Sequence, residues 1–172
     1  MYHLILTVAL AAADSSKPFV SQEGSFSVRF PSDPSYDTLT VPTPEGPQVR
    51  RVFRYSDDEV VYFLVHTCMP PPTLPSEPEV TLTMGRDSGL QMAGGILVSE
   101  KSVSVGRHRG RRLVETIPGA GIAYALIVLG DHGTYYSLGA APRSAKVTKK
   151  AEAFLDSFKV LPPTDKAWCK TR

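Results

Sequence analysis

The feature that most constrains the fold is an apolar run, Ile122–Leu129, which a short Gly130–Gly133 segment separates from a second strand-like run, Thr134–Ala140. A connection this short joins antiparallel neighbours, so the two runs form a hairpin. Because the first run is apolar on both faces, it needs cover on both faces of its sheet. We therefore predict an antiparallel sheet with a further layer on each side, and we expect 122–129 to be its central strand.

Further strand signals lie on both sides of this hairpin. Residues 25–30 alternate apolar and polar side chains, which predicts a half-buried strand. Residues 59–67 are apolar on both faces and predict an interior strand. The remaining predicted strands are 36–41 and 49–55, which flank a Pro-rich turn at 42–47, and 96–105 and 111–117.

Two segments have helical spacing. Ser76 and Glu79 have the spacing of a capping box, and the helix that they begin ends near Gly94. The second helix carries one apolar stripe, formed by Val147, Ala151, Phe154, Leu155 and Phe158. The predicted class is therefore α+β: an antiparallel sheet of about six to eight strands flanked by two main helices.

The amino terminus resembles a secretory signal. Residues 1–13 contain no charged side chain and end in Ala11, Ala12 and Ala13, the small residues that signal peptidase accepts. We predict a signal peptide at 1–13, a linker at 14–18, a single domain at 19–161 and a polar tail at 162–172. The predicted location is outside the cytoplasm, either periplasmic or extracellular. An exported chain with two cysteines, Cys68 and Cys169, can carry one disulfide or two free thiols, and the sequence leaves both open.

Composition excludes several classes. The chain has 172 residues, 42% of them hydrophobic, and a formal net charge of +2. This apolar content is too high for a disordered chain, and the net charge is too small for a general nucleic-acid binder. The apolar amino-terminal run is too short to span a bilayer, so we expect no transmembrane segment. We also expect no nucleic acid among the partners, because the chain is predicted to be exported and lacks an aromatic-basic strand motif.

Three local patterns together resemble a group of small exported bacterial domains that are similar to the PsbP-like fold of photosystem II extrinsic proteins. They are residues 24–31, which look like the opening strand; residues 97–113; and residues 153–159, which look like the closing helix. The resemblance covers nearly all of 19–161. It implies a PsbP-like α/β/α sandwich, and it implies no reaction, because no catalytic motif comes with it.

No set of residues meets the requirements of a catalytic, metal or cofactor site. His66 and Cys68 share one strand face, which provides two metal ligands where zinc needs three or four. His132 lies in a turn, and Ser88 lies in a predicted helix without the Gly-x-Ser-x-Gly elbow. Glu100 and Glu115 form an acid/base pair only if they face each other across strands; partners such as Arg111 or Arg112 are the simpler expectation. We predict no catalytic residues, no metal and no cofactor.

One local feature stands above background, the arginines Arg107, Arg109, Arg111 and Arg112. With a second group at Arg50, Arg51 and Arg54 on the same edge, they could hold a polyanion; alternatively, they protect an edge strand from aggregation. Our main hypothesis is a non-enzymatic exported module that binds a protein or cell-envelope component. An anion binder centred on Arg107–Arg112 is the first alternative, and a hydrolase using His66 or His132 is the second.

Overall fold

The computed structural model describes residues 17–43, 46–69, 77–144, 148–164 and 169, so the predicted signal peptide lies outside the described residues. In chain order the elements are β1 Phe19–Ser21, β2 Phe26–Val28, β3 Ser35–Thr43, β4 Gly46–Ser56, β5 Val60–Cys68, α1 Pro78–Ala93, β6 Ile96–Val105, β7 His108–Ile117, β8 Gly121–Leu129, the 3-10 turn η1 Asp131–Gly133, β9 Thr134–Pro142, α2 Thr148–Asp156 and β10 Lys159–Val160.

A seven-stranded sheet in the order β3-β4-β5-β9-β8-β7-β6 forms the centre of the molecule, and every neighbouring pair in it is antiparallel. Its two edges are therefore β3 and β6. A smaller, three-stranded sheet has the order β1-β2-β10, which joins the beginning of the domain to its end.

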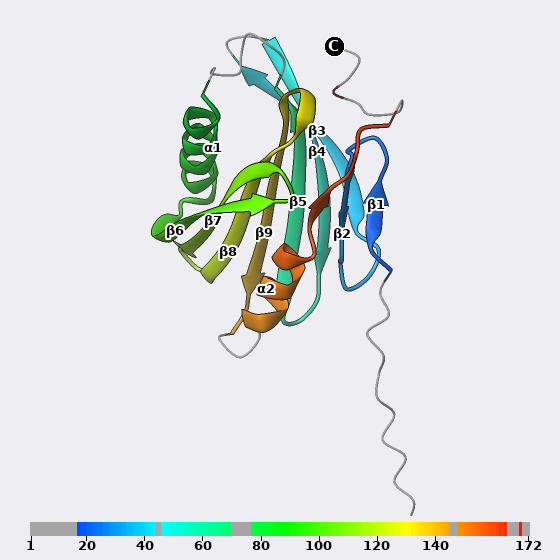
Figure 1. Cartoon of the computed structure of the whole chain (residues 1–172). Helices are drawn as coiled ribbons and strands as arrows, with labels where there is room; N and C mark the ends of the chain where they lie inside the picture. Colours follow the sequence, from blue (N-terminus) through cyan, green and yellow to red (C-terminus); the bar gives the residue numbers. More distant parts are fainter. Residues whose placement is uncertain (1–16, 44–45, 70–76, 145–147, 165–168, 170–172) are drawn as a thin grey trace, which may run out of the picture.

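The two helices cover opposite faces of the large sheet. Side chains of adjacent residues on a strand point to opposite faces. On β7, Arg111 bonds to Glu79 of α1, whereas the next residue, Arg112, bonds to Asp156 of α2. Figure 1 shows α1 at the left of the large sheet and strands β1 and β2 at its right. The architecture is thus the predicted α+β layered sandwich with two flanking helices.

The main core lies between the large sheet, α2 and the small sheet. Phe26 of β2 is fully buried, and its ring contacts Phe53, Tyr136 and Phe158 at centroid distances of 5.5, 5.8 and 6.1 Å. Burial of each such side chain contributes about 1.5–3 kcal/mol to stability. The Tyr136 hydroxyl donates a hydrogen bond of 2.7 Å to the Gly24 carbonyl, which holds the turn before β2 against the large sheet.

The predicted interior strand and both hairpins are present, but three expectations about individual elements are wrong. The amino-terminal cap of α1 is the extended Glu77 rather than Ser76, because a residue before proline is kept out of the helical region and Pro78 then begins the helix. The central strand of the large sheet is β9, next to β8. Strand β2 is buried throughout instead of on one face: Phe26 and Val28 lie in the main core, and Ser27, which points the other way, is only 8% exposed.

Among the described residues, no helix has the length and apolar character needed to cross a membrane. The longer of the two helices, α1, has 16 residues and many exposed side chains.

Candidate binding site

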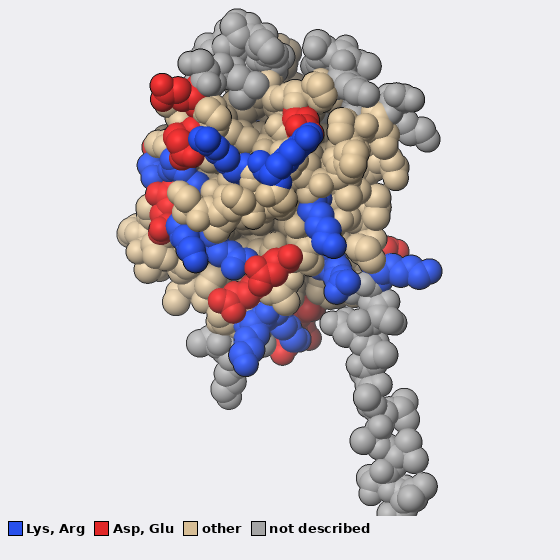
Figure 2. Space-filling view, in the orientation of Figure 1, with Lys and Arg blue, Asp and Glu red and all other residues tan. Residues whose placement is uncertain are grey.

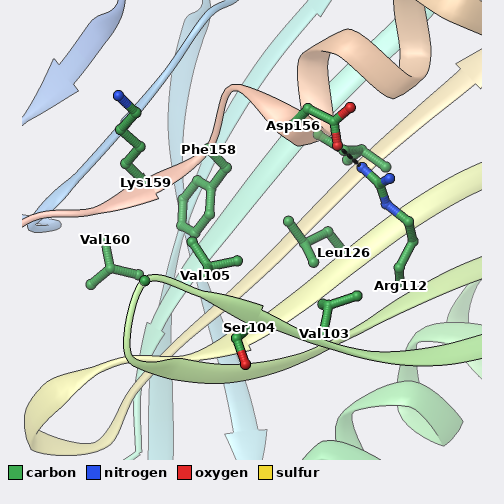
Figure 3. Close-up of a pocket in the computed structure, with 11 residues that line it drawn as sticks. Val103, Ser104, Val105, Arg112, Leu126, Asp156, Phe158, Lys159 and Val160 are labelled. Carbon is green, nitrogen blue, oxygen red and sulfur yellow. Dashed lines mark hydrogen bonds and ion pairs between the residues drawn. The ribbon is translucent and has the colours of Figure 1, made fainter.

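A cleft opens where the cover on the α2 face ends. Helix α2 packs chiefly on β9, β8 and β5, so this face is left partly uncovered toward β6. The cleft has a volume of about 560 Å³ and lies between the end of β6 on one side and the end of α2 with β10 on the other. We call it the β6–α2 cleft (Figure 3). Its apolar wall consists of Val103, Val105, Leu126, Leu155, Phe158 and Val160.

Strand periodicity produces this apolar wall. Val103 and Val105 are two residues apart on β6, so both point to the α2 face, and both are partly buried against the main core. Across the cleft, Phe158 follows the end of α2 and is 3% exposed. In Figure 3, the Phe158 ring points toward Val105, and Leu126 lies between them and Arg112.

Charged groups stand at the two ends of the cleft. Arg112 and Asp156 form an ion pair at one end, and Lys159 lies at the other, pointing away from the apolar wall (Figure 3). The Arg112 charge is balanced by its partner, whereas no ion pair is found for Lys159 within the described part of the chain. The cleft therefore has apolar surface in the middle and a cation, Lys159, at one end.

Strand β6 also offers hydrogen-bonding groups, because it is an edge of the large sheet. Along its free side, backbone N–H and C=O groups have no neighbouring strand within the part of the chain that the structure describes. The strand has 10 residues, and the apolar side chains of Ile96 and Val98 are 68% and 61% exposed. Exposed apolar side chains on a long open edge are typical of a surface that pairs with another chain.

The predicted arginine cluster does not converge on one point. Arg107 pairs with Asp131 at 2.7 Å, and Arg109 lies 3.8 Å from Glu79. Arg111 is only 11% exposed and pairs with Glu100 at 2.6 Å and Glu79 at 2.9 Å. Arg112 points to the opposite face. Each of the four arginines therefore has a carboxylate partner, and they divide between two faces of the sheet.

The second arginine group, Arg50, Arg51 and Arg54, does not share an edge with the first. It lies on β4, and three strands, β5, β9 and β8, separate β4 from β7. Arg51 pairs with Glu23, and the Arg50 Nε donates to the Gln48 side chain at 3.3 Å. On the face seen in Figure 2, Lys and Arg atoms lie among Asp and Glu atoms. Among the described residues, the two arginine groups therefore do not form a single basic edge.

The candidate acid/base pair consists of two carboxyls in different surroundings. Burial alone would raise the pKa of Glu100, but hydrogen bonds from Arg111 and Arg86 outweigh it and lower the pKa. Glu115 is 7% exposed, and burial raises its pKa. Glu100 thus has the arginine partner that was the simpler expectation. Ser88 lies exposed on α1, and His132 is an exposed residue of the η1 turn with a φ of 54°.

Cys68 and Cys169 form a disulfide, which ties the carboxy-terminal tail to the end of β5. His66, two residues before Cys68, lies beside it: its Nε2 is 3.8 Å from Cys169 Sγ. The His66 imidazole is 1% exposed, stacks on Tyr136 at 5.4 Å and meets the edge of Phe26. Burial, assisted by the charge of Arg51, lowers the His66 pKa to about 3, so the imidazole is neutral.

Comparison with solved structures places this architecture in the class of PsbP-like α+β sandwiches. The structure is similar to the solution structure of cyanobacterial PsbP (CyanoP) from Synechocystis sp. PCC 6803, with a TM-score of 0.58 and 12% sequence identity. The match covers 91% of this chain and 98% of CyanoP. No protein-family model matches the sequence, and no curated protein matches it. The chain therefore has a PsbP-like fold, as its opening strand, middle segment and closing helix predict.

Proposed function

We propose that this chain is an exported, non-enzymatic binding module whose β6–α2 cleft takes an extended segment of a partner protein of the cell envelope. The observation that carries the proposal is the open edge of β6 beside the apolar cleft. An added strand would gain main-chain hydrogen bonds along β6. Its alternate side chains would enter the cleft and cover Val103 and Val105. The PsbP-like fold supports an accessory or binding role.

The partner segment should combine apolar side chains with an acidic one. The wall of the cleft is apolar, and Lys159 supplies a cation at one end. A carboxylate near Lys159 would add electrostatic complementarity, which contributes to specificity and the rate of association more than to affinity. A polyanion is a poorer fit, because all four arginines of the predicted cluster already have carboxylate partners.

A non-enzymatic role is supported by the dispersion of the groups that a hydrolase would need. Ser88 lies on α1, His132 lies in the η1 turn, and His66 is buried on β5. Binding by strand addition needs none of them.

Photo-crosslinking tests this proposal. A benzophenone side chain at Ser104, which is exposed and borders the cleft, should crosslink a protein from cell-envelope extract under near-ultraviolet light. The matched control is Thr38, an exposed hydroxyl residue on the other edge strand, β3. Crosslinking at Ser104 that disappears in a Val105→Glu background supports the proposal. Equal crosslinking at both edges, or none at Ser104, contradicts it.

A further inference from the structure

His66, Cys68 and Cys169 bring three metal-ligating atoms together. Their Nε2 and Sγ atoms all lie within 4.8 Å of one another, and we call these residues the Cys–His cluster. The first two residues come from one strand, and the third comes from a segment 101 residues beyond Cys68. The cluster lies on the α2 face of β5, and the three strands β9, β8 and β7 separate β5 from β6, the strand that borders the β6–α2 cleft.

Part of the geometry already matches a tetrahedral zinc site. Bonds of about 2.3 Å from Zn²⁺ to sulfur and about 2.0 Å to nitrogen place two such ligands about 3.5 Å apart. The observed separation of His66 Nε2 and Cys169 Sγ is 3.8 Å. The two sulfurs are too close for such a site, since they are covalently bonded to each other.

The imidazole is prepared to act as a ligand. The rings of Tyr136 and Phe26 fix its orientation, and its Nε2 atom lies 3.8 Å from Cys169 Sγ. A neutral imidazole nitrogen in this position is the form that binds a metal ion. The Cys169 side chain also borders a small cavity of about 10 Å³, close to the space that one water needs as a fourth ligand.

We propose that reduction of the Cys68–Cys169 disulfide converts the Cys–His cluster into a Zn²⁺ site, with His66 Nε2 and the two cysteine thiolates as protein ligands. Two thiolates and one imidazole suit a soft or borderline cation, whereas Mg²⁺ and Ca²⁺ prefer oxygen ligands. Such a site binds metal in one redox state only, because a disulfide has no thiolate to offer.

The chemical steps balance with a dithiol as the reductant. One thiolate of the dithiol attacks Cys169 Sγ, which is more exposed than Cys68, and Cys68 leaves as a thiolate. The second thiol of the dithiol then attacks the mixed disulfide, releasing Cys169 and leaving the reductant as a disulfide. Two electrons and two protons pass to the protein cysteines. Binding of Zn²⁺ afterwards releases those two protons and leaves two metal-thiolate bonds.

Spectroscopic titration of the full chain tests the site. The protein is reduced with dithiothreitol, freed of reductant without oxygen, and titrated with Co²⁺, whose thiolate charge-transfer and tetrahedral absorption bands report the ligands. Zn²⁺ should then displace Co²⁺ at a ratio of one per chain. We expect the oxidised protein to bind Zn²⁺ at least about 100-fold more weakly, since even the loss of an outer-shell contact costs about 10–100-fold.

Variants assign the ligands. Cys169→Ser and His66→Gln should each lose the tight site. His108→Gln is the matched control that should keep it, because His108 lies on β7, which β9 and β8 separate from β5. Alkylation of the reduced wild-type chain gives the same test without a substitution and should abolish binding. If reduction unfolds the chain, recovery of its circular dichroism on addition of Zn²⁺ supports the site.

Four results overturn the proposal. These are failure of the dithiol to release two thiols from the native protein, equal metal binding by the oxidised and reduced chains, tight binding that survives alkylation, and reductive unfolding that Zn²⁺ does not reverse.

Discussion

Loss of the Cys68–Cys169 disulfide should lower the stability of the domain by several kcal/mol. The bond closes a loop with a sequence separation of 101 residues. For a loop of this length, the chain-entropy treatment gives about 4.7 kcal/mol at 25 °C, because the cross-link removes conformations from the unfolded chain. Native single domains have a free energy of unfolding of about 5–15 kcal/mol, so this one bond supplies a large share of the stability of the domain.

Urea unfolding of the wild type and the Cys68→Ser/Cys169→Ser double variant measures this contribution. With a urea dependence of about 2 kcal/mol per molar, the midpoint should fall by about 2 M. Either single variant should cost about as much as the double variant, since each breaks the same bond. The reduced and alkylated wild-type chain should behave like the double variant. The reasoning would be refuted if the double variant lost less than about 1 kcal/mol of unfolding free energy, or if the losses of the two single variants summed to the loss of the double variant.

Two further pairs of substitutions test the packing and the electrostatics. Gly110→Ala on β7 should lower the free energy of unfolding by about 1–3 kcal/mol, because a Cβ there would lie 2.5 Å from the Ile127 carbonyl oxygen. In Gly89→Ala on α1, the new Cβ meets no atom within 4 Å, so this variant should raise the free energy of unfolding by about 0.5–1 kcal/mol in the same urea assay. Glu115→Gln should stabilise the protein at neutral pH, because it removes a buried charge. The pKa of Glu115 is raised in the folded state, so its charge destabilises the fold as pH rises through that pKa, and the difference between variant and wild type vanishes in acid. Glu100→Gln should destabilise at neutral pH, since its lowered pKa reflects ion pairs that are lost as pH falls. Unfolding curves between acid and neutral pH check both signs, and a Glu115→Gln variant less stable than wild type at neutral pH would contradict the first.

Much of the fold could be predicted from the sequence, because apolar periodicity and turn residues act locally. The interior strand β5, the β8–β9 hairpin and the buried face of α2, formed by Ala151, Phe154 and Leu155, follow from spacing alone. The small sheet could not be predicted in this way: β1 and β10 have three and two residues, and they form only because β2 lies between them.

The candidate sites depend on contacts that no local pattern records. The sequence drew attention to the arginines of β7, but their carboxylate partners come from α1, β6 and α2. These partners balance the arginine charges, so the arginines do not form a single basic surface. The β6–α2 cleft exists because α2 ends at Asp156, before it reaches β6. Cys169 completes the Cys–His cluster from a distant segment. The signals in the sequence were the placement of His66 and Cys68 on one strand face and an even number of cysteines.

Hydrogen exchange tests the central claim, that an extended partner segment adds to the open edge of β6. Amide exchange is measured for the protein alone and for its complex with the partner that photo-crosslinking at Ser104 identifies. Strand addition should slow amide exchange along Ile96–Val105 and in the Phe158–Val160 segment across the cleft, while β3, the opposite edge, keeps its rate. Val105→Glu should abolish this protection, and Val98→Glu, on β6 but outside the cleft, should abolish less of it. Protection on β3 or α1 with none on β6 would contradict the claim.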